Sequence, residues 1–241
     1  MTSGETKAAR AGRKHVARAR NQYAGACPDG TAENVAAERS DAAARNLADA
    51  KIAVGANVAA KLTVFTIGHS TRAIEEFIAL LAAHGVARLV DVRSIPKSRR
   101  VPQFNSDALA ASLRKEGIEY IHMQSLGGRR HAKKDSVNLG WRNVSFRGYA
   151  DYMASEEFRT ALAHLLELAR EKRTAIMCAE AVPWRCHRSL IGDALLVRGA
   201  HVQDIMSVTS VKAHALTPFA KVEGLNVVYP AGFEQGKLQL S

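Results

Sequence analysis

Short apolar runs alternate with amphipathic segments along the chain from residue 62 onward. Apolar runs of roughly four to eight residues, bounded by turn residues, are typical of buried strands. The predicted strands are Leu62–Ile67, Ala87–Val92, Ile118–Met123, Thr174–Met177, Val202–Val208 and Leu225–Tyr229. Most of them end at a polar or glycine-containing turn.

Helical periodicity separates these strands. The clearest case is Glu156–Lys172, which repeats large apolar residues on one face and follows Ser155, a favourable N-cap. Shorter amphipathic segments follow Thr71, run from Ser106 to Glu116, and end near Gly199. Strands that alternate with helices indicate right-handed crossovers. The sequence therefore predicts an α/β fold of three layers, a mostly parallel sheet of about five or six strands with helices on both faces.

The first 61 residues differ from the rest, because they are rich in Ala and Arg and carry few large apolar side chains. Such a segment buries too little surface to offset the entropy of ordering. We expect residues 1–61 to be a disordered leader, with a basic nucleic-acid-binding arm as the alternative. The α/β domain then spans residues 62–230, and residues 231–241 form a C-terminal tail.

Composition narrows the class of protein. No apolar run approaches the roughly 20 residues that cross a bilayer, and the N-terminus has no apolar signal segment. Three cysteines, an odd number, predict no disulfide framework and favour the reducing cytoplasm. The formal net charge of +11 favours anionic partners. Neither a cofactor nor an oligomeric state follows from the sequence.

Reactive residue types are concentrated between the strand Thr174–Met177 and the helix that follows it. This loop contains Cys178, Glu180, Arg185, Cys186, His187 and Arg188. Ligands of open α/β sheets bind at the carboxyl ends of strands, and a helix N-terminus adds unpaired N–H groups. Arginines and a helix N-terminus lower a thiol pKa, so Cys178 and Cys186 are candidates for covalent or ligand chemistry. Glu180 and His187 are the candidate proton carriers.

The turns after the first three strands carry further polar residues, which we expect to meet the cysteine loop in one cleft. These are His69 and Ser70, Asp91 and Arg93, and Gly127, Gly128 and Arg129. Asp91 is placed to orient Arg93 through a two-point contact. The predicted anion-binding arginines are Arg93, Arg129, Arg185 and Arg188, with His69, Ser70 and Asp91 as further ligand-binding residues.

Other interpretations of these residues stay open. The cysteines could be small buried apolar groups, and Glu180 could pair with Arg188 or Arg93 to hold the loop. A metal site that adds a distant His69 or His122 to Cys178, Cys186 and His187 has suitable ligand types, but the spacing matches no known zinc pattern, so none is predicted.

A basic stretch supports a second hypothesis. Between Arg93 and Arg147 there are twelve lysines and arginines and four acidic residues, a balance of about +8. Phe104, Trp141 and Phe146 are interleaved and could stack on bases. The partner is therefore an anionic small molecule or a nucleic acid, and the alternative function is a non-catalytic nucleic-acid-binding module with structural cysteines.

Several separated motifs occur together: GHS, DVRSIPKSRRVPQF, LGGRR, MCAE and CHRSLI. In this order they resemble the prokaryotic family catalogued as domain of unknown function 488, over about residues 63–230. The resemblance implies an α/β domain and brings no established reaction. It also implies shared polar residues at His69, Ser70, Asp91, Arg93, Cys178, Glu180, Cys186, His187 and Arg188.

A fainter similarity links the strand-end Cys178 and a loop arginine, Arg185 or Arg188, to rhodanese-type sulfurtransferases and cysteine phosphatases. That resemblance implies a thiol cradled by backbone N–H groups. Here six residues separate Cys178 from Arg185, and Pro183 and Trp184 replace the small residues that let such loops wrap tightly.

Overall fold

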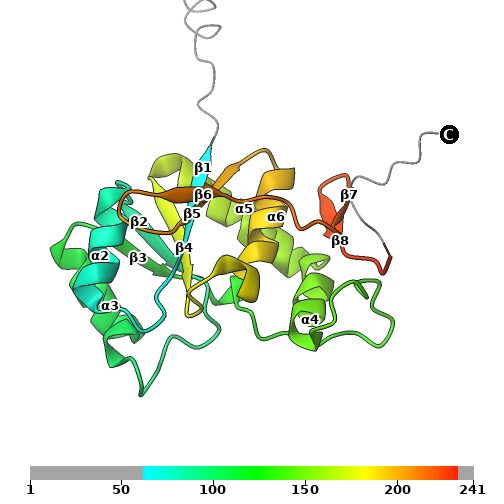
Figure 1. The fold of residues 1–241 in the computed structure, drawn as a ribbon, viewed down its shortest axis with the longest axis horizontal. Coiled ribbons are helices and arrows are strands. Elements are labelled where there is room, and N and C mark those ends of the chain that lie inside the picture. The colour runs from blue at the N-terminus through cyan, green and yellow to red at the C-terminus, as the bar shows by residue number, and fades with distance from the viewer. Residues whose placement is uncertain (1–61, 233–241) are drawn as a thin grey trace, which may run out of the picture. The chain divides into compact units, whose positions relative to one another are not determined.

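A computed structural model of the chain describes residues 62–232, which form one six-stranded sheet, a small hairpin and the helices that cover the sheet (Figure 1). The sheet strands are β1 (Thr63–Gly68), β2 (Arg88–Asp91), β3 (Glu119–His122), β4 (Thr174–Cys178), β5 (His201–Ile205) and β6 (Val211–Ala213). Their order is β3-β2-β4-β1-β5-β6, with the first five parallel and β6 antiparallel at the edge. The predicted leader, residues 1–61, and nearly all of the predicted tail lie outside the described residues.

Helices cover both faces of the sheet. Within residues 62–232 they are α2 (Ile74–Ala83), α3 (Ser106–Lys115), α4 (Val144–Met153), α5 (Glu156–Glu171) and α6 (Arg188–Val197). Alternate residues of each strand point to opposite faces. Phe65 of β1 therefore packs in the core under α2 and α3, while its neighbour Val64 packs in the core under α5 and α6. The predicted three-layer α/β fold is confirmed.

None of the helices among residues 62–232 is both long enough and apolar enough to cross a membrane.

The last predicted strand lies elsewhere than expected. Its residues form β8 (Asn226–Val228), which pairs with β7 (Lys221–Glu223) in a separate antiparallel hairpin. Gly224 allows the tight turn between them because its φ of 63° suits a residue without a side chain. The sixth strand of the main sheet is instead β6, a three-residue exposed strand too short to show a pattern.

The helix α4 was not predicted, because the polar stretch before it suggests a loop. Its first turn is nevertheless capped by Asn143, whose side chain accepts hydrogen bonds from the backbone N–H groups of Ser145 and Phe146. The stronger helix α5 begins as predicted, with Ser155 accepting from the Phe158 N–H.

A buried polar cluster holds the segment after β6 against the sheet. Asp193 of α6 accepts hydrogen bonds from the Tyr229 hydroxyl at 2.8 Å and from the Thr217 N–H at 3.1 Å. The His214 imidazole lies between Asp193, at 3.0 Å, and Asp204, at 3.7 Å. Burial alone would lower the pKa of His214, but hydrogen bonds to the two carboxylates outweigh it and raise that pKa to about 9.

This cluster makes stability depend on pH. A raised folded-state pKa means that protonated His214 stabilises the fold fully below about pH 6.5, and that this contribution disappears as the pH rises through about 9. We compare the unfolding free energy of the wild-type protein with that of a His214→Gln variant. We expect the stability advantage of the wild type to be larger at pH 6 than at pH 9.5, by up to about 3 kcal/mol.

Urea unfolding at both pH values measures this difference. The exposed His164, substituted in the same way, serves as the control and should show little pH-dependent difference from wild type. A His214→Gln effect of equal size at both pH values would contradict the assignment.

Candidate functional site

The candidate site lies at the carboxyl ends of two neighbouring parallel strands, β2 and β4, after which the chain continues on opposite faces of the sheet. After β2 the chain continues to α3 on one face, and after β4 it continues to α6 on the other. Such a divergence opens a crevice at the carboxyl edge of an α/β sheet. A cleft of about 380 Å³ occupies this position. Its lining residues are Arg93, Ser94, Ile95, Gly128, Arg129, Ser145, Phe146, Cys178, Ala179, Glu180, Arg185, Cys186 and His187.

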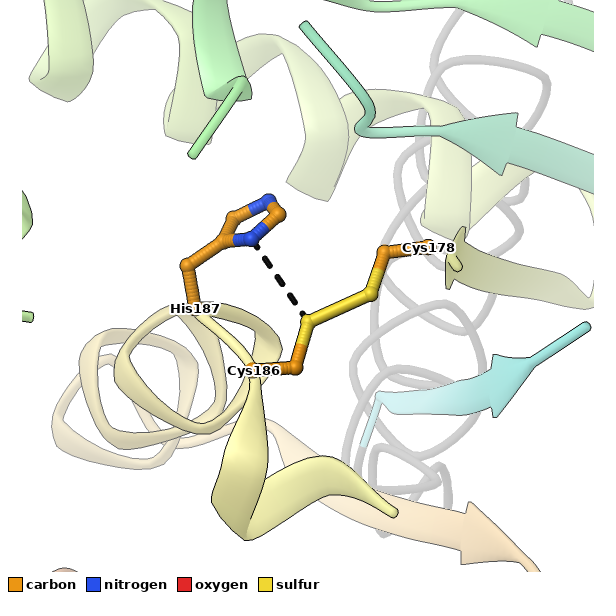
Figure 2. A group of neighbouring side chains, drawn as sticks. All are labelled: Cys178, Cys186 and His187. Carbon is orange, nitrogen blue, oxygen red and sulfur yellow. Dashed lines mark hydrogen bonds between the residues drawn. A yellow bond between two sulfur atoms is a disulfide. The ribbon is translucent and has the colours of Figure 1, made fainter. Parts of the chain in front are cut away.

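One ring nitrogen of His187 is anchored by a backbone carbonyl, and the other faces the Cys186 sulfur. Its Nε2 lies 2.9 Å from the carbonyl oxygen of Val92, and because that oxygen only accepts, Nε2 carries the proton. Burial lowers the pKa of His187 to about 4, so the ring is neutral at physiological pH. The unprotonated Nδ1 therefore presents its lone pair to the Cys186 Sγ, 3.5 Å away (Figure 2).

The two cysteines approach each other at the floor of the cleft. Cys178 ends β4 and Cys186 precedes α6, and both side chains are almost fully buried. The Cys186 Sγ accepts the backbone N–H of Arg188 at 3.5 Å, a contact with the first turn of α6. Their sulfur atoms are joined as a disulfide (Figure 2). The expectation of no disulfide was therefore wrong, since an odd cysteine count does not say which two lie together.

Arg93 lines the cleft, but most of its hydrogen-bonding capacity is used inside the protein. Its Nε and Nη2 donate to both carboxylate oxygens of Asp91, and Nη2 also donates to the Phe104 carbonyl. Its Nη1 lies 3.3 Å from the His69 Nε2. A guanidinium has five N–H groups, so one remains for a ligand. Asp91 thus holds Arg93 by the expected two-point contact, and Tyr120 donates a further hydrogen bond to Asp91.

His69 and Ser70 lie behind Arg93 rather than in the cleft. The His69 ring stacks on Phe104 with centroids 4.3 Å apart, and its Nδ1 lies 2.8 Å from the Ser70 carbonyl oxygen. Burial lowers the pKa of His69 to about 4, helped by the nearby Arg93 charge, so the ring is neutral. Its unprotonated Nε2 then accepts from Arg93, and His69 reaches the cleft only through that arginine.

Arg188 points into the interior and does not line the cleft. Its guanidinium donates to the Thr66 hydroxyl at 3.1 Å and to the Glu180 carbonyl at 2.6 Å. Only 1% of the residue is exposed, and burial lowers its pKa to about 10. Arg188 therefore holds the cysteine loop in position from below. The prediction that it binds an anion in the cleft was wrong, because its guanidinium is buried.

Three charged residues stand on the exposed rim of the cleft: Arg129, Glu180 and Arg185. Within residues 62–232, the side chains of Arg129 and Arg185 make no hydrogen bond or ion pair. The Arg129 backbone N–H donates to the Ser94 hydroxyl at 3.0 Å, which ties two lining loops together. The rim is therefore built from segments that are distant in sequence and carries two exposed guanidiniums.

Sequence reasoning did not assign five of the lining residues to the cleft: Ser94, Ile95, Ser145, Phe146 and Ala179. Phe146 was singled out only as a stacking aromatic, and Ser145 opens the unpredicted helix α4. The Asn143 cap was the available signal for both. Ile95 is 53% exposed, and nothing in its sequence context distinguishes it from an ordinary loop residue.

Comparison with known proteins gives one match. Residues 73–195, just over half of the 241-residue chain, match the family model described as Domain of unknown function DUF488. No curated protein and no solved structure matches the chain. The fainter similarity to rhodanese-type sulfurtransferases and cysteine phosphatases therefore has no support from these comparisons.

Gly128 sets the position of the His187 ring. A Cβ atom at residue 128 would overlap His187 Nδ1 and the adjacent ring atoms, so the imidazole would have to move. We expect Gly128→Ala to displace His187 from Cys186 and to slow alkylation of the reduced Cys186 thiol by iodoacetamide by about tenfold at pH 7, because the thiol loses its proton acceptor.

Mass spectrometry of peptides from the reduced protein measures this rate residue by residue. The variant Ser125→Ala alters a half-buried residue that does not line the cleft, and it should leave the rate unchanged. An unchanged rate in a folded Gly128→Ala protein would show that His187 does not influence the thiol.

Proposed function

This chain belongs to the family of domains of unknown function 488, which carries no assigned reaction, and from that premise we propose that its cleft binds an anionic, phosphate-bearing ligand. The observation that supports the proposal is that two exposed arginines, Arg129 and Arg185, line the same cleft as a group of sulfur and imidazole. Guanidiniums bind phosphate oxygens through two parallel hydrogen bonds.

The three arginines of the cleft would contact the anion in different ways. Arg129 and Arg185 belong to loops after β3 and β4 and would close on the anion from two sides of the rim. Arg93 contributes one N–H from a rigid position, since Asp91, Phe104 and His69 already hold the rest of its guanidinium. A rigid central donor with two movable outer ones suits a ligand that enters from solvent.

The cysteine group would act on the bound ligand as a transferase or hydrolase. In the reduced protein, His187 Nδ1 can accept the Cys186 thiol proton, and the thiolate then attacks the phosphorus while the bond to the leaving oxygen breaks. Glu180, at the exposed rim, would supply the proton to that oxygen. Alternatively, Cys178 and Cys186 would hold a metal ion, which would supply Lewis-acid chemistry to the bound phosphate. Both forms of chemistry need the same anion in the same cleft.

Removing the rim charges tests anion binding. We expect Arg129→Ala and Arg185→Ala each to weaken binding of inorganic phosphate by about tenfold, because each loses a charge-assisted hydrogen bond of about 1.5 kcal/mol. Isothermal titration calorimetry of the reduced protein measures the affinity. The exposed Arg170 on α5, which does not line the cleft, is the matched control, and Arg170→Ala should bind as wild type does. Equal phosphate affinity in all four proteins would reject the proposal.

A specific observation favours the alternative of nucleic-acid binding. The loop after β2 exposes Lys97, Arg99 and Arg100 in sequence directly beyond the cleft residue Ile95. If this surface and Arg129 bind a single-stranded oligonucleotide, about four phosphate contacts predict a roughly fiftyfold loss of affinity between about 50 and 200 mM salt.

Fluorescence anisotropy with a labelled oligonucleotide measures that salt dependence. Replacing all three loop residues by Ala should flatten it under the nucleic-acid hypothesis, while leaving binding of inorganic phosphate in the cleft unchanged. No oligonucleotide binding at low salt would eliminate this alternative.

A further inference from the structure

Three metal-ligating groups meet at the floor of the cleft. We propose that in the reduced protein Cys178, Cys186 and His187 hold one divalent metal ion of the zinc class, with its fourth coordination position facing the cleft. The second half of this proposal, an anionic ligand at that position, rests on the function proposed above.

Once the disulfide is reduced, the three donor atoms are close enough to share one ion. The two Sγ atoms and one nitrogen of His187 all lie within 4.8 Å of one another. Zinc binds thiolate at about 2.3 Å and imidazole at about 2.0 Å, so donors around one tetrahedral ion stand about 3.3–3.8 Å apart. Because the structure joins the two sulfurs as a disulfide, reduction has to separate them before both can ligate one ion. The Cα atoms of the cysteines are 7.7 Å apart, which leaves room for a metal ion between the two thiolates of the reduced protein.

The imidazole is prepared for metal binding by its hydrogen bond. Histidine ligands usually donate their second ring N–H to a carbonyl or carboxylate, which fixes the tautomer and the ring orientation. His187 does this through Nε2 and the Val92 carbonyl at 2.9 Å, and Nδ1 with its lone pair then faces Cys186 (Figure 2). Tyr149 packs against the same ring with centroids 5.0 Å apart, which limits its rotation.

The charge of the two thiolates also favours a bound divalent ion. Two adjacent thiolates in a nearly buried position repel each other and are poorly solvated. One divalent ion neutralises both, and the Arg188 N–H already donates to the Cys186 sulfur from the start of α6. Such N–H contacts to a ligating sulfur are part of the outer shell of metal sites.

The number of protein ligands, three, is typical of a catalytic metal site rather than a structural one. Among the described residues, no further cysteine, histidine or carboxylate joins the group. The two histidines considered from the sequence are held elsewhere: His122 against the Arg93 carbonyl at 2.8 Å, and His69 against Arg93 and Ser70. Structural zinc sites have four protein ligands, whereas catalytic ones have three and an open position. The fourth position would be open to the cleft, which Arg129 and Arg185 also line.

Cobalt provides a spectroscopic test on the full chain. The reduced, metal-free protein is titrated with Co²⁺, whose tetrahedral thiolate complexes absorb in the visible and near ultraviolet. We expect one ion per chain with a sulfur-to-metal charge-transfer band, and displacement of Co²⁺ by Zn²⁺. Cys178→Ser, Cys186→Ser and His187→Gln should each abolish stoichiometric binding, with the fold checked by circular dichroism.

The third cysteine supplies the matched control. Cys27 lies outside the described residues, and Cys27→Ser removes one thiol while leaving the other two in place. This variant should bind Co²⁺ as the wild type does. The metal site is overturned if the reduced wild-type protein shows no charge-transfer band, or if Cys27→Ser loses it while Cys178→Ser and Cys186→Ser retain it.

Adding inorganic phosphate to the cobalt protein separates this inference from the proposed function. We expect phosphate to shift the visible cobalt bands in the wild type, and the Arg129→Ala/Arg185→Ala double variant to need at least about tenfold more phosphate for the same shift. Stoichiometric cobalt binding without any phosphate response would support the metal site and reject the anion ligand. Phosphate binding by calorimetry in a protein that binds no cobalt would support the anion ligand and reject the metal.

Discussion

The candidate site depends on one buried guanidinium. Arg188 begins α6 and donates hydrogen bonds to Thr66 of β1 and to the Glu180 carbonyl beyond β4, so it ties a helix to the ends of two neighbouring strands. A buried charge is tolerated only where partners compensate for lost water. Asp204 provides a compensating negative charge indirectly. Its carboxylate accepts a hydrogen bond from the Thr66 hydroxyl, which in turn accepts one from Arg188. The residues immediately before Arg188 are Cys186 and His187, and their positions follow from this anchor.

Close backbone packing reinforces that anchor. Gly68 lies so near the Glu180 carbonyl that any side chain at residue 68 would overlap it. The backbone pairing of β1 and β4 continues past the strands, with the His69 and Ser70 N–H groups donating to the carbonyls of Cys178 and Ala179. The beginning of the cysteine loop is therefore held by backbone contacts, independent of side-chain chemistry.

The charge of the site's ionisable groups differs between the floor and the rim of the cleft. The two histidines near the floor, His69 and His187, are neutral because burial lowers their pKa values to about 4. The positive charge is carried by arginines, of which Arg93 is neutralised by Asp91 while Arg129 and Arg185 face solvent. The exposed positive charge therefore lies at the rim of the cleft, and polarisable sulfur and neutral imidazole lie at its floor. Neutral imidazole is also the form of histidine that ligates a metal or accepts a proton.

The sequence by itself determined the order of β1 to β5 and of the helices between them apart from α4, because hydrophobic periodicity reports local burial. It also placed Cys178, Arg93 and Arg129 after successive strands, and parallel strands bring their carboxyl ends to one edge. Tertiary structure alone decided that β4 inserts between β1 and β2, which opens the cleft beside Arg93 and leaves His69 behind it. It also decided that Arg188 turns inward and His187 toward sulfur, since their partners, Thr66 and Val92, are about a hundred residues away in the chain. Local pattern carries no information about such distant hydrogen bonds.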